Sequence, residues 1–116
     1  MAKIIGPGSL IVDITGFAPH LPVGEETVKG SKIRLDPGGK GSNQMTAAHR
    51  AGSEVFIISK RGDDALGNIL KEHYKTEGMT EKYVDISSEN ETGGAFIEID
   101  IQEAKNELSR KFSLCW

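Results

Sequence analysis

An unbroken apolar run, Val55-Phe56-Ile57-Ile58, lies between two segments with helical periodicity and limits this chain to a small set of folds. Such a run is typical of a strand that is buried on both faces of a parallel sheet. The first helix is expected over about 42–51, with Gly52 as its C-terminal stop. The second opens at 62–64, and its core-facing residues recur at helical spacing: Leu66, Ile69, Leu70, His73 and Tyr74. This helix–strand–helix order predicts an α/β fold with right-handed crossovers.

Further strands are predicted on both sides of this unit. Ile4-Ile5 and residues 10–12 read as one first strand that contains Gly6-Pro7-Gly8, and it is expected to be bulged or to begin late because proline cannot donate to a sheet ladder. Residues 15–37 read as a turn-rich excursion that holds a short hairpin between 26 and 35. The remaining strands are predicted at 83–86 and 95–101. At 116 residues the chain suffices for one small domain.

Composition and charge exclude several classes of partner. A net charge of −3 and scattered lysines and arginines predict no nucleic-acid interface. The apolar stretches are strand-sized, and Gly6, Pro7 and Gly8 interrupt any signal-peptide core, so no membrane segment or secretion signal is expected. The single cysteine, Cys115, has no partner for an internal disulfide, which favours a cytoplasmic location.

The first candidate ligand residue is Asp13, which follows the first predicted strand. Carboxylates at the C-terminal ends of parallel strands lie where α/β folds bind ligands. An ionised aspartate only accepts hydrogen bonds and can hold two hydroxyls of a sugar. The alternative is an aspartate that only caps a turn.

The second candidate is the segment Gly38-Gly39-Lys40-Gly41-Ser42-Asn43, which opens the first predicted helix. Glycines there let the backbone approach a ligand, and the free N–H groups favour anions or hydroxyl oxygens. It is neither a Walker loop, because Gly41 separates Lys40 from Ser42, nor a dinucleotide fingerprint. The alternative is a simple glycine turn with Ser42 as the N-cap.

A third segment, Gly62-Asp63-Asp64, is interpreted as structural. Aspartate before a helix is a good N-cap and interacts favourably with the helix dipole. A metal would need a third ligand, and none is visible nearby in the sequence. His20, His49 and His73 also lack the spacing of a ligand set, so no metal site is predicted.

Together and in order, these segments resemble the ribokinase-like (PfkB) carbohydrate kinases, and the lid and glycine segments are most similar to those of ribokinases. The resemblance runs from Lys3 to about Asp100. It is carried by five segments: 8–13, the strand opening; 21–27, the entry to a β-lid; 37–43, the first signature; 61–67; and 91–97, a Thr-Gly strand.

The resemblance implies the N-terminal portion of a three-layer α/β/α fold with a small β-sheet lid at about 15–37, and ATP-dependent phosphorylation of a sugar hydroxyl. It also implies a small-molecule sugar as partner and a possible homodimer through the lid. Full-length members use ATP, Mg²⁺ and a monovalent cation. By resemblance, the residues that bind the sugar are Asp13, Gly39, Lys40, Asn43, Ala95 and Ile97.

The sequence departs from this family in several ways. Gly6-Pro7 is unusual in the first strand, and Met45 stands where a small residue is commoner. The second signature, a Gly-Ala-Gly-Asp helix start that supplies the catalytic base, does not occur, so no catalytic residue is assigned. Because phosphoryl transfer needs positioned phosphates, Mg²⁺ and a base, the chain alone is expected to be inactive and to bind nucleotide poorly.

The tail, residues 101–116, reads as polar and helix-like where the family has a turn and a strand. We explain this difference by the hypothesis of a frameshift or truncation in the gene. Back-translation of the tail, read two bases later, permits residues typical of a turn followed by a strand. The main interpretation is therefore a sugar kinase fragment whose catalytic half is missing. The alternatives are a non-catalytic sugar-binding or dimerising module and an inactive pseudogene product.

Overall fold

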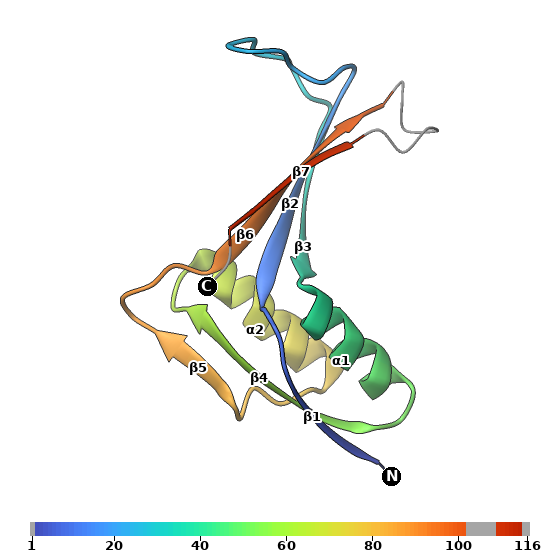
Figure 1. The fold of residues 1–116 in the computed structure, drawn as a ribbon, viewed down its shortest axis with the longest axis vertical. Helices are drawn as coiled ribbons and strands as arrows, with labels where there is room; N and C mark the ends of the chain where they lie inside the picture. The colour runs from blue at the N-terminus through green and yellow to red at the C-terminus, as the bar shows by residue number, and fades with distance from the viewer. Residues whose placement is uncertain (1, 102–108, 115–116) are drawn as a thin grey trace.

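The computed structural model describes residues 2–101 and 109–114, the last six by their backbone alone (Figure 1). Two helices and seven strands occur within these residues. The helices are α1 (Lys40–Arg50) and α2 (Ala65–Glu77). The strands are β1 (Lys3–Pro7), β2 (Ile11–Ala18), β3 (Lys32–Gly38), β4 (Glu54–Gly62), β5 (Val84–Ser87), β6 (Gly93–Asp100) and β7 (Ser109–Leu114).

The lower layer confirms the predicted α/β class. Strands β1, β4 and β5 form a parallel sheet in the order β1-β4-β5, and α1 and α2 pack against it (Figure 1). The core lies between the helices and this sheet. Its buried members are Leu10, Val12, Val55, Ile57, Leu70, Tyr74, Met79 and Val84.

The upper layer is a four-stranded sheet in the order β3-β2-β6-β7, which projects from the lower layer (Figure 1) and is called the lid below. Strand β2 pairs antiparallel with β3 and parallel with β6, and β7 pairs antiparallel with β6. The lid therefore consists of strands from three parts of the chain, residues 11–38, 93–100 and 109–114, whereas the sequence predicted it only at 15–37. The hairpin expected between 26 and 35 is wrong: β3 begins only at Lys32 and pairs with β2, so the hairpin is formed by β2 and β3 with residues 19–31 between them.

The predicted single first strand is two strands in different sheets. Pro7 is the last residue of β1 and pairs with Ile58, and the Gly8 N–H donates to the Ile58 carbonyl at 3.1 Å. The chain then leaves the lower sheet and enters the lid at Ile11. Proline marks the end of the first strand because it cannot continue the ladder.

The expectation that the apolar run in β4 is buried on both faces is wrong for this chain. Val55 and Ile57 are buried, but Ile58 is 49% exposed. Side chains alternate between the two faces of a strand, and both helices cover the face that carries Val55 and Ile57. The other face therefore lacks a covering layer in the described part of the chain.

The helix-like interpretation of the tail is wrong over residues 109–114, which form β7 along β6. The open edge of β6 offers a ladder of backbone groups to these residues. Residues 102–108 and 115–116, which include Cys115, lie outside the described residues, and the frameshift hypothesis stays a prediction. No helix in the described part of the chain combines the length and apolar character that crossing a bilayer requires.

Two departures from the family pattern compensate each other in the structure. Met45, on α1, packs against Gly6 of β1, where an added Cβ would collide with the Met45 methyl group. A larger side chain at 45 is thus accommodated by the absence of one at 6. Close packing of this kind couples the volumes of the two residues.

Asp64 ties the start of α2 to the start of β6, as expected of a structural N-cap. Its carboxylate accepts hydrogen bonds from the Gly67 N–H at 2.8 Å, the Thr92 N–H at 2.9 Å and the Thr92 hydroxyl at 2.6 Å. The Thr92 hydroxyl oxygen accepts the Gly62 N–H at 2.9 Å. One carboxylate and one hydroxyl therefore join β4, α2 and the lid strand β6.

This junction predicts a specific dependence of stability on pH. Burial alone would raise the pKa of the Asp64 carboxyl, but hydrogen bonds from Thr92 and Gly67 outweigh it and lower the pKa below its ordinary value. A carboxyl with a lowered folded-state pKa stabilises the fold above its unfolded pKa, about 3.9, and this contribution is lost as the pH falls through the folded-state pKa.

We therefore expect Thr92→Val to lower stability at neutral pH by about 2 kcal/mol, because the buried Gly62 N–H loses its acceptor. The variant should also lose less further stability between pH 5 and pH 2 than the wild type, because the Asp64 pKa moves back toward its ordinary value. Thermal melts across this range measure both effects. Equal losses in the two proteins on acidification would contradict the role assigned to Asp64.

Candidate functional site

Asp13 lies in the lid strand β2, just beyond the point where the chain leaves the lower sheet. It is thus near the start of a strand, not at its end as the sequence suggested. It pairs with Asp36 of β3 on one side and with Ala95 of β6 on the other. Directly opposite residues share a sheet face, so these three side chains stand in one row.

The Asp13 carboxylate has an unused acceptor. Its Oδ1 atom is buried and has no hydrogen-bond partner in the described part of the chain. A buried acceptor without a donor is costly, and such atoms are uncommon in folded proteins. A ligand hydroxyl at this position would supply the missing donor.

The predicted glycine segment brings the start of α1 against Asp13. A Cβ at Gly38 would lie 2.5 Å from Asp13 Oδ1, and one at Gly41 would lie 2.6 Å from the Cα of Gly8. Gly39 has a φ of 100°, in the region that favours glycine, and a Cβ there would collide with the Ser9 carbonyl oxygen. A side chain at any of these three positions would not fit. Gly39 and Gly41 lie against another backbone segment, and Gly38 lies against the Asp13 carboxylate.

No side chain caps the N-terminus of α1. Gly39 is the N-cap, and no side chain makes a capping hydrogen bond there. The alternative with Ser42 as N-cap is wrong, because Ser42 is buried within the helix and its hydroxyl pairs with the Tyr74 hydroxyl at 3.2 Å. The first N–H groups of a helix and its dipole suit ligand oxygens, and the exposed Lys40 adds a positive charge.

Asn43 lines a groove of about 500 Å³ between the end of β3 and the two helices. Asp36 lines the same groove and is held by Arg34, whose Nε donates to Asp36 Oδ2 at 2.5 Å. Sequence reasoning missed Asp36 because it precedes Pro37-Gly38 and reads as part of a turn. The signal that identifies it is the β2–β3 register, which places it opposite Asp13.

The two predicted residues of β6 share the sheet face of Asp13. Ala95 is fully buried beside Asp13, whereas Ile97 pairs with Thr15 and is therefore one step further along the lid. The structure thus places Ala95 beside Asp13 and packs Gly38 against the Asp13 carboxylate. Gly39, Lys40 and Asn43 follow Gly38 at the start of α1.

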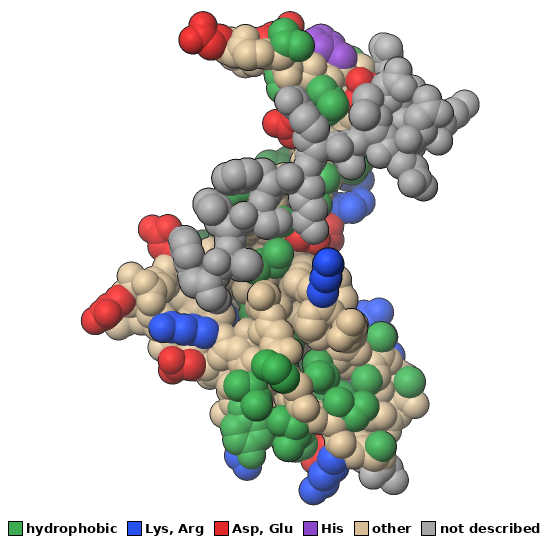
Figure 2. Space-filling view, viewed as in Figure 1, with side chains coloured by type: hydrophobic (Ala, Val, Ile, Leu, Met, Phe, Trp, Pro, Cys, Tyr) green, Lys and Arg blue, Asp and Glu red, His purple; other side chains and the backbone are tan. Residues whose placement is uncertain are grey.

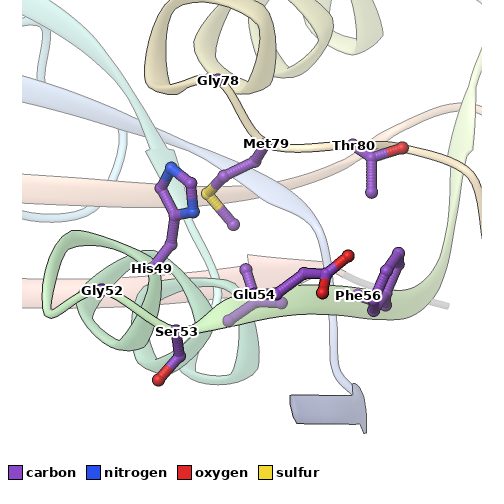
Figure 3. A pocket seen from close by; sticks show the side chains of 9 residues that line it. His49, Gly52, Ser53, Glu54, Phe56, Gly78, Met79 and Thr80 are labelled. Carbon is purple, nitrogen blue, oxygen red and sulfur yellow. The ribbon is translucent and has the colours of Figure 1, made fainter. Parts of the chain in front are cut away.

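A separate, largely apolar pocket of about 440 Å³ lies where β4 begins, between the ends of α1 and α2 (Figure 3). His49 borders it, with Nε2 at 2.8 Å from the Glu77 carbonyl oxygen. Open α/β sheets bind ligands outside the carboxyl ends of their strands, and this pocket is at the opposite end of β4. We therefore do not assign it to the site. Within residues 2–101, no three His, Cys, Asp or Glu side chains are grouped to hold a metal.

Comparison with known proteins decides the family. The sequence model described as pfkB family carbohydrate kinase matches residues 1–110. The chain belongs to this family. The match confirms the resemblance and extends past Asp100.

Ribokinases are among the similar pfkB proteins. Ribokinase from Bacillus subtilis is 36% identical over 97 residues, which are 84% of this chain and 33% of that enzyme. The crystal structure of ribokinase from Cryptococcus neoformans in complex with ADP matches 98% of this chain and 35% of its own, with a TM-score of 0.79 and 27% identity. Ribokinase from Thermotoga maritima matches all of this chain and 36% of its own, with a TM-score of 0.80 and 26% identity. The pfkB chain thus spans about a third of the length of these relatives.

Proposed function

We propose that this chain forms the sugar-holding portion of an ATP-dependent sugar kinase, with ribose as the first candidate substrate. The observation that carries the proposal is the buried, unpartnered Oδ1 of Asp13 next to Gly38, where the chain enters the uncapped N-terminus of α1. Sugars present adjacent hydroxyls, which donate to a carboxylate and accept from N–H groups. The names of the similar ribokinases support ribose in particular.

Each residue of the proposed site has a role that its position supports. Asp13 accepts hydrogen bonds from two sugar hydroxyls. Gly39 and Lys40 present N–H groups and a positive charge to the sugar oxygens, and Asn43 donates or accepts from the groove side. Ala95 and Ile97 pack near the sugar from β6.

Phosphoryl transfer would require parts that this sequence does not contain. In the full-length kinases, ATP, Mg²⁺ and a monovalent cation would act with the Gly-Ala-Gly-Asp signature, which is absent from residues 1–116. We therefore propose that the chain alone binds sugar but neither binds ATP well nor transfers its phosphate. A cytoplasmic location suits the single cysteine.

A dimerising role has one observation in its favour. One face of the lid carries an apolar row, in which the half-buried Ile14 pairs with Leu35 on one side and Phe96 on the other, with Ile33 nearby. Leu35, Phe96 and Ile33 are 46%, 45% and 71% exposed. A second copy of the chain that packs on this row would give a dimer through the lid, and sedimentation of an Ile33→Lys variant would test it.

The sugar proposal predicts an unusual pair of effects for Asp13→Asn. Ribose affinity should fall about 10- to 100-fold, because a charge-assisted hydrogen bond is worth about 1.5–3 kcal/mol. The free protein should keep or gain thermal stability, because the substitution removes a charge that faces Asp36 across the sheet and lacks a partner at Oδ1.

Titration calorimetry with ribose measures the affinity, and Asp63→Asn is the matched control. Asp63 is an exposed aspartate next to α2, so the control should bind ribose as the wild type does. Unchanged ribose affinity in Asp13→Asn would contradict the proposed site. A loss of affinity together with a loss of folding would instead assign Asp13 a structural role.

A further inference from the structure

The pocket of about 440 Å³ at the start of β4 takes no part in the proposed sugar site (Figure 3). Its volume falls within the range of small-molecule pockets, which is about 300–1,000 Å³. The residues that line it come from two short segments, 49–56 and 78–80. Ligand pockets combine an apolar wall with a few polar groups that select the ligand, and this pocket has both.

Both helices end at this pocket. Gly52 and Ser53 follow the end of α1, Gly78 and Met79 follow the end of α2, and all four line the pocket. The C-terminus of a helix carries a partial negative charge of about half an elementary charge, and its last carbonyl oxygens lack partners within the helix. Two such ends at one pocket favour a positively charged ligand.

Glu54 adds a full negative charge to the same pocket. Its side chain extends from β4 toward the segment of Met79 and Thr80 (Figure 3). Within residues 2–101 its half-buried carboxylate has neither an ion pair nor a hydrogen bond. Lys3 lies opposite Glu54 in the β1–β4 register, but no ion pair joins them. A cationic ligand would supply the counter-charge that this carboxylate lacks.

His49 presents an acceptor to this pocket. Its Nε2 atom lies 2.8 Å from the Glu77 carbonyl oxygen. Because a carbonyl oxygen only accepts, Nε2 carries the hydrogen, and in the neutral ring Nδ1 is left as an acceptor. Arg50, the last residue of α1, is bound by the Glu77 carboxylate, and no Lys or Arg is among the described residues that line the pocket. The polar groups around it therefore suit a ligand that donates hydrogen bonds.

Phe56 and Met79 give the pocket its apolar wall. An aromatic ring face attracts cations, and a thioether is polarizable and adapts to ligands of irregular shape. Figure 2 shows hydrophobic side chains gathered over the lower part of the molecule, where β4 lies. An apolar wall beside a carboxylate and carbonyl oxygens fits a ligand with an apolar body and a positive end. We propose that this pocket binds a small organic cation, namely a protonated primary amine on a compact apolar or aromatic body.

This amine site is separate from the proposed sugar site. It lies at the opposite end of β4 from the carboxyl end of that strand, and its lining includes none of the proposed sugar residues. The proposal thus goes beyond the sugar kinase function. Amine binding can fail while ribose binding at Asp13 holds, and the reverse is equally possible.

NMR titration of the 116-residue chain with 2-phenylethylamine, which is protonated at neutral pH, tests the site directly. 2-Phenylethanol and 3-phenylpropionate carry the same ring on an uncharged and on an anionic chain. We expect amide shifts confined to residues 49–56 and 78–80. The amine should bind about tenfold more tightly than the alcohol, and the propionate should not bind. Equal affinities for amine and alcohol would overturn the proposal, as would amine shifts elsewhere in the chain or no shifts at millimolar amine.

Two matched variants locate the charge that selects the amine. Glu54→Gln should remove most of the amine's advantage and leave the affinity for the alcohol unchanged. Glu72→Gln makes the same change at an exposed position on α2, outside the pocket, and should alter neither affinity. Melting curves check that each variant folds, and ribose titration of Glu54→Gln should match the wild type. Amine affinity unaffected by Glu54→Gln, or lowered equally by both variants, would overturn the assignment of the pocket.

Discussion

Replacing Gly41 with alanine is expected to destabilise the chain by about 2 kcal/mol and to abolish ribose binding. The added Cβ would lie 2.6 Å from the Cα of Gly8, and neither backbone can rotate away as a side chain would. Alanine gains about 1 kcal/mol of helix propensity over glycine, so the clash must exceed that gain. To relieve it, α1 must move from the β1–β2 connection, which separates its N-terminus from Asp13.

The control for this substitution is Gly16→Ala in the lid strand β2. A Cβ at Gly16 meets nothing within 4 Å, so this change should be neutral or slightly stabilising. Chemical denaturation and ribose titration of both variants measure the two effects. A Gly41→Ala protein as stable as the wild type, with intact ribose binding, would show that the close approach of α1 is not needed.

The second large effect is expected from Glu81→Ala, which should cost about 3–5 kcal/mol. Arg61 is buried, with its side chain 4% exposed, and its Nε and Nη2 donate to the two Glu81 carboxylate oxygens at 2.8 and 3.3 Å. Nη1 donates to the Gly62 carbonyl at 3.1 Å. Removing the carboxylate leaves a buried guanidinium that lacks its counter-charge.

Two further variants separate this explanation from a general effect of losing a glutamate. Glu77→Ala removes the partner of Arg50, which is 64% exposed, and should cost much less because water solvates the freed charge. The double variant Arg61→Met with Glu81→Leu should recover most of the lost stability, since no buried charge remains. Equal losses for Glu81→Ala and Glu77→Ala in urea denaturation would contradict the account.

Local chemistry made much of the fold predictable from sequence. The first helix was placed within two residues at both ends, because Gly52 follows it, and the start of the second within three, because Asp64 caps it. The end of the second helix, at Gly78, was not predicted. The α/β class followed from the strand–helix alternation. In each case the signal lies within a few residues of the feature that it specifies.

The division of strands between two sheets could not be predicted in the same way. Residues 4–12 read as one strand, yet the chain changes sheets between Pro7 and Ile11 because each side finds a different partner. The exposure of Ile58 could not be predicted either, because it depends on which face of the sheet the two helices cover. Both outcomes are set by residues distant in sequence.

In the candidate site, too, features set by neighbouring residues were predictable, and features set by distant residues were not. Asp13 and the glycine segment were identified from their own residue types and from family resemblance. Asp36 was missed because its relevance comes from pairing with Asp13, 23 positions away, and a one-residue change of register would place it on the other face.

Thermal melting of the 116-residue chain with ribose, with ATP and with neither tests the central claim most directly. A sugar that binds only the folded state raises its melting temperature by mass action. The account predicts a cooperative transition that ribose raises and ATP does not, with no ribose effect in Asp13→Asn. A transition indifferent to ribose, or one raised by ATP alone, would contradict the claim that this chain holds the sugar half of a kinase site.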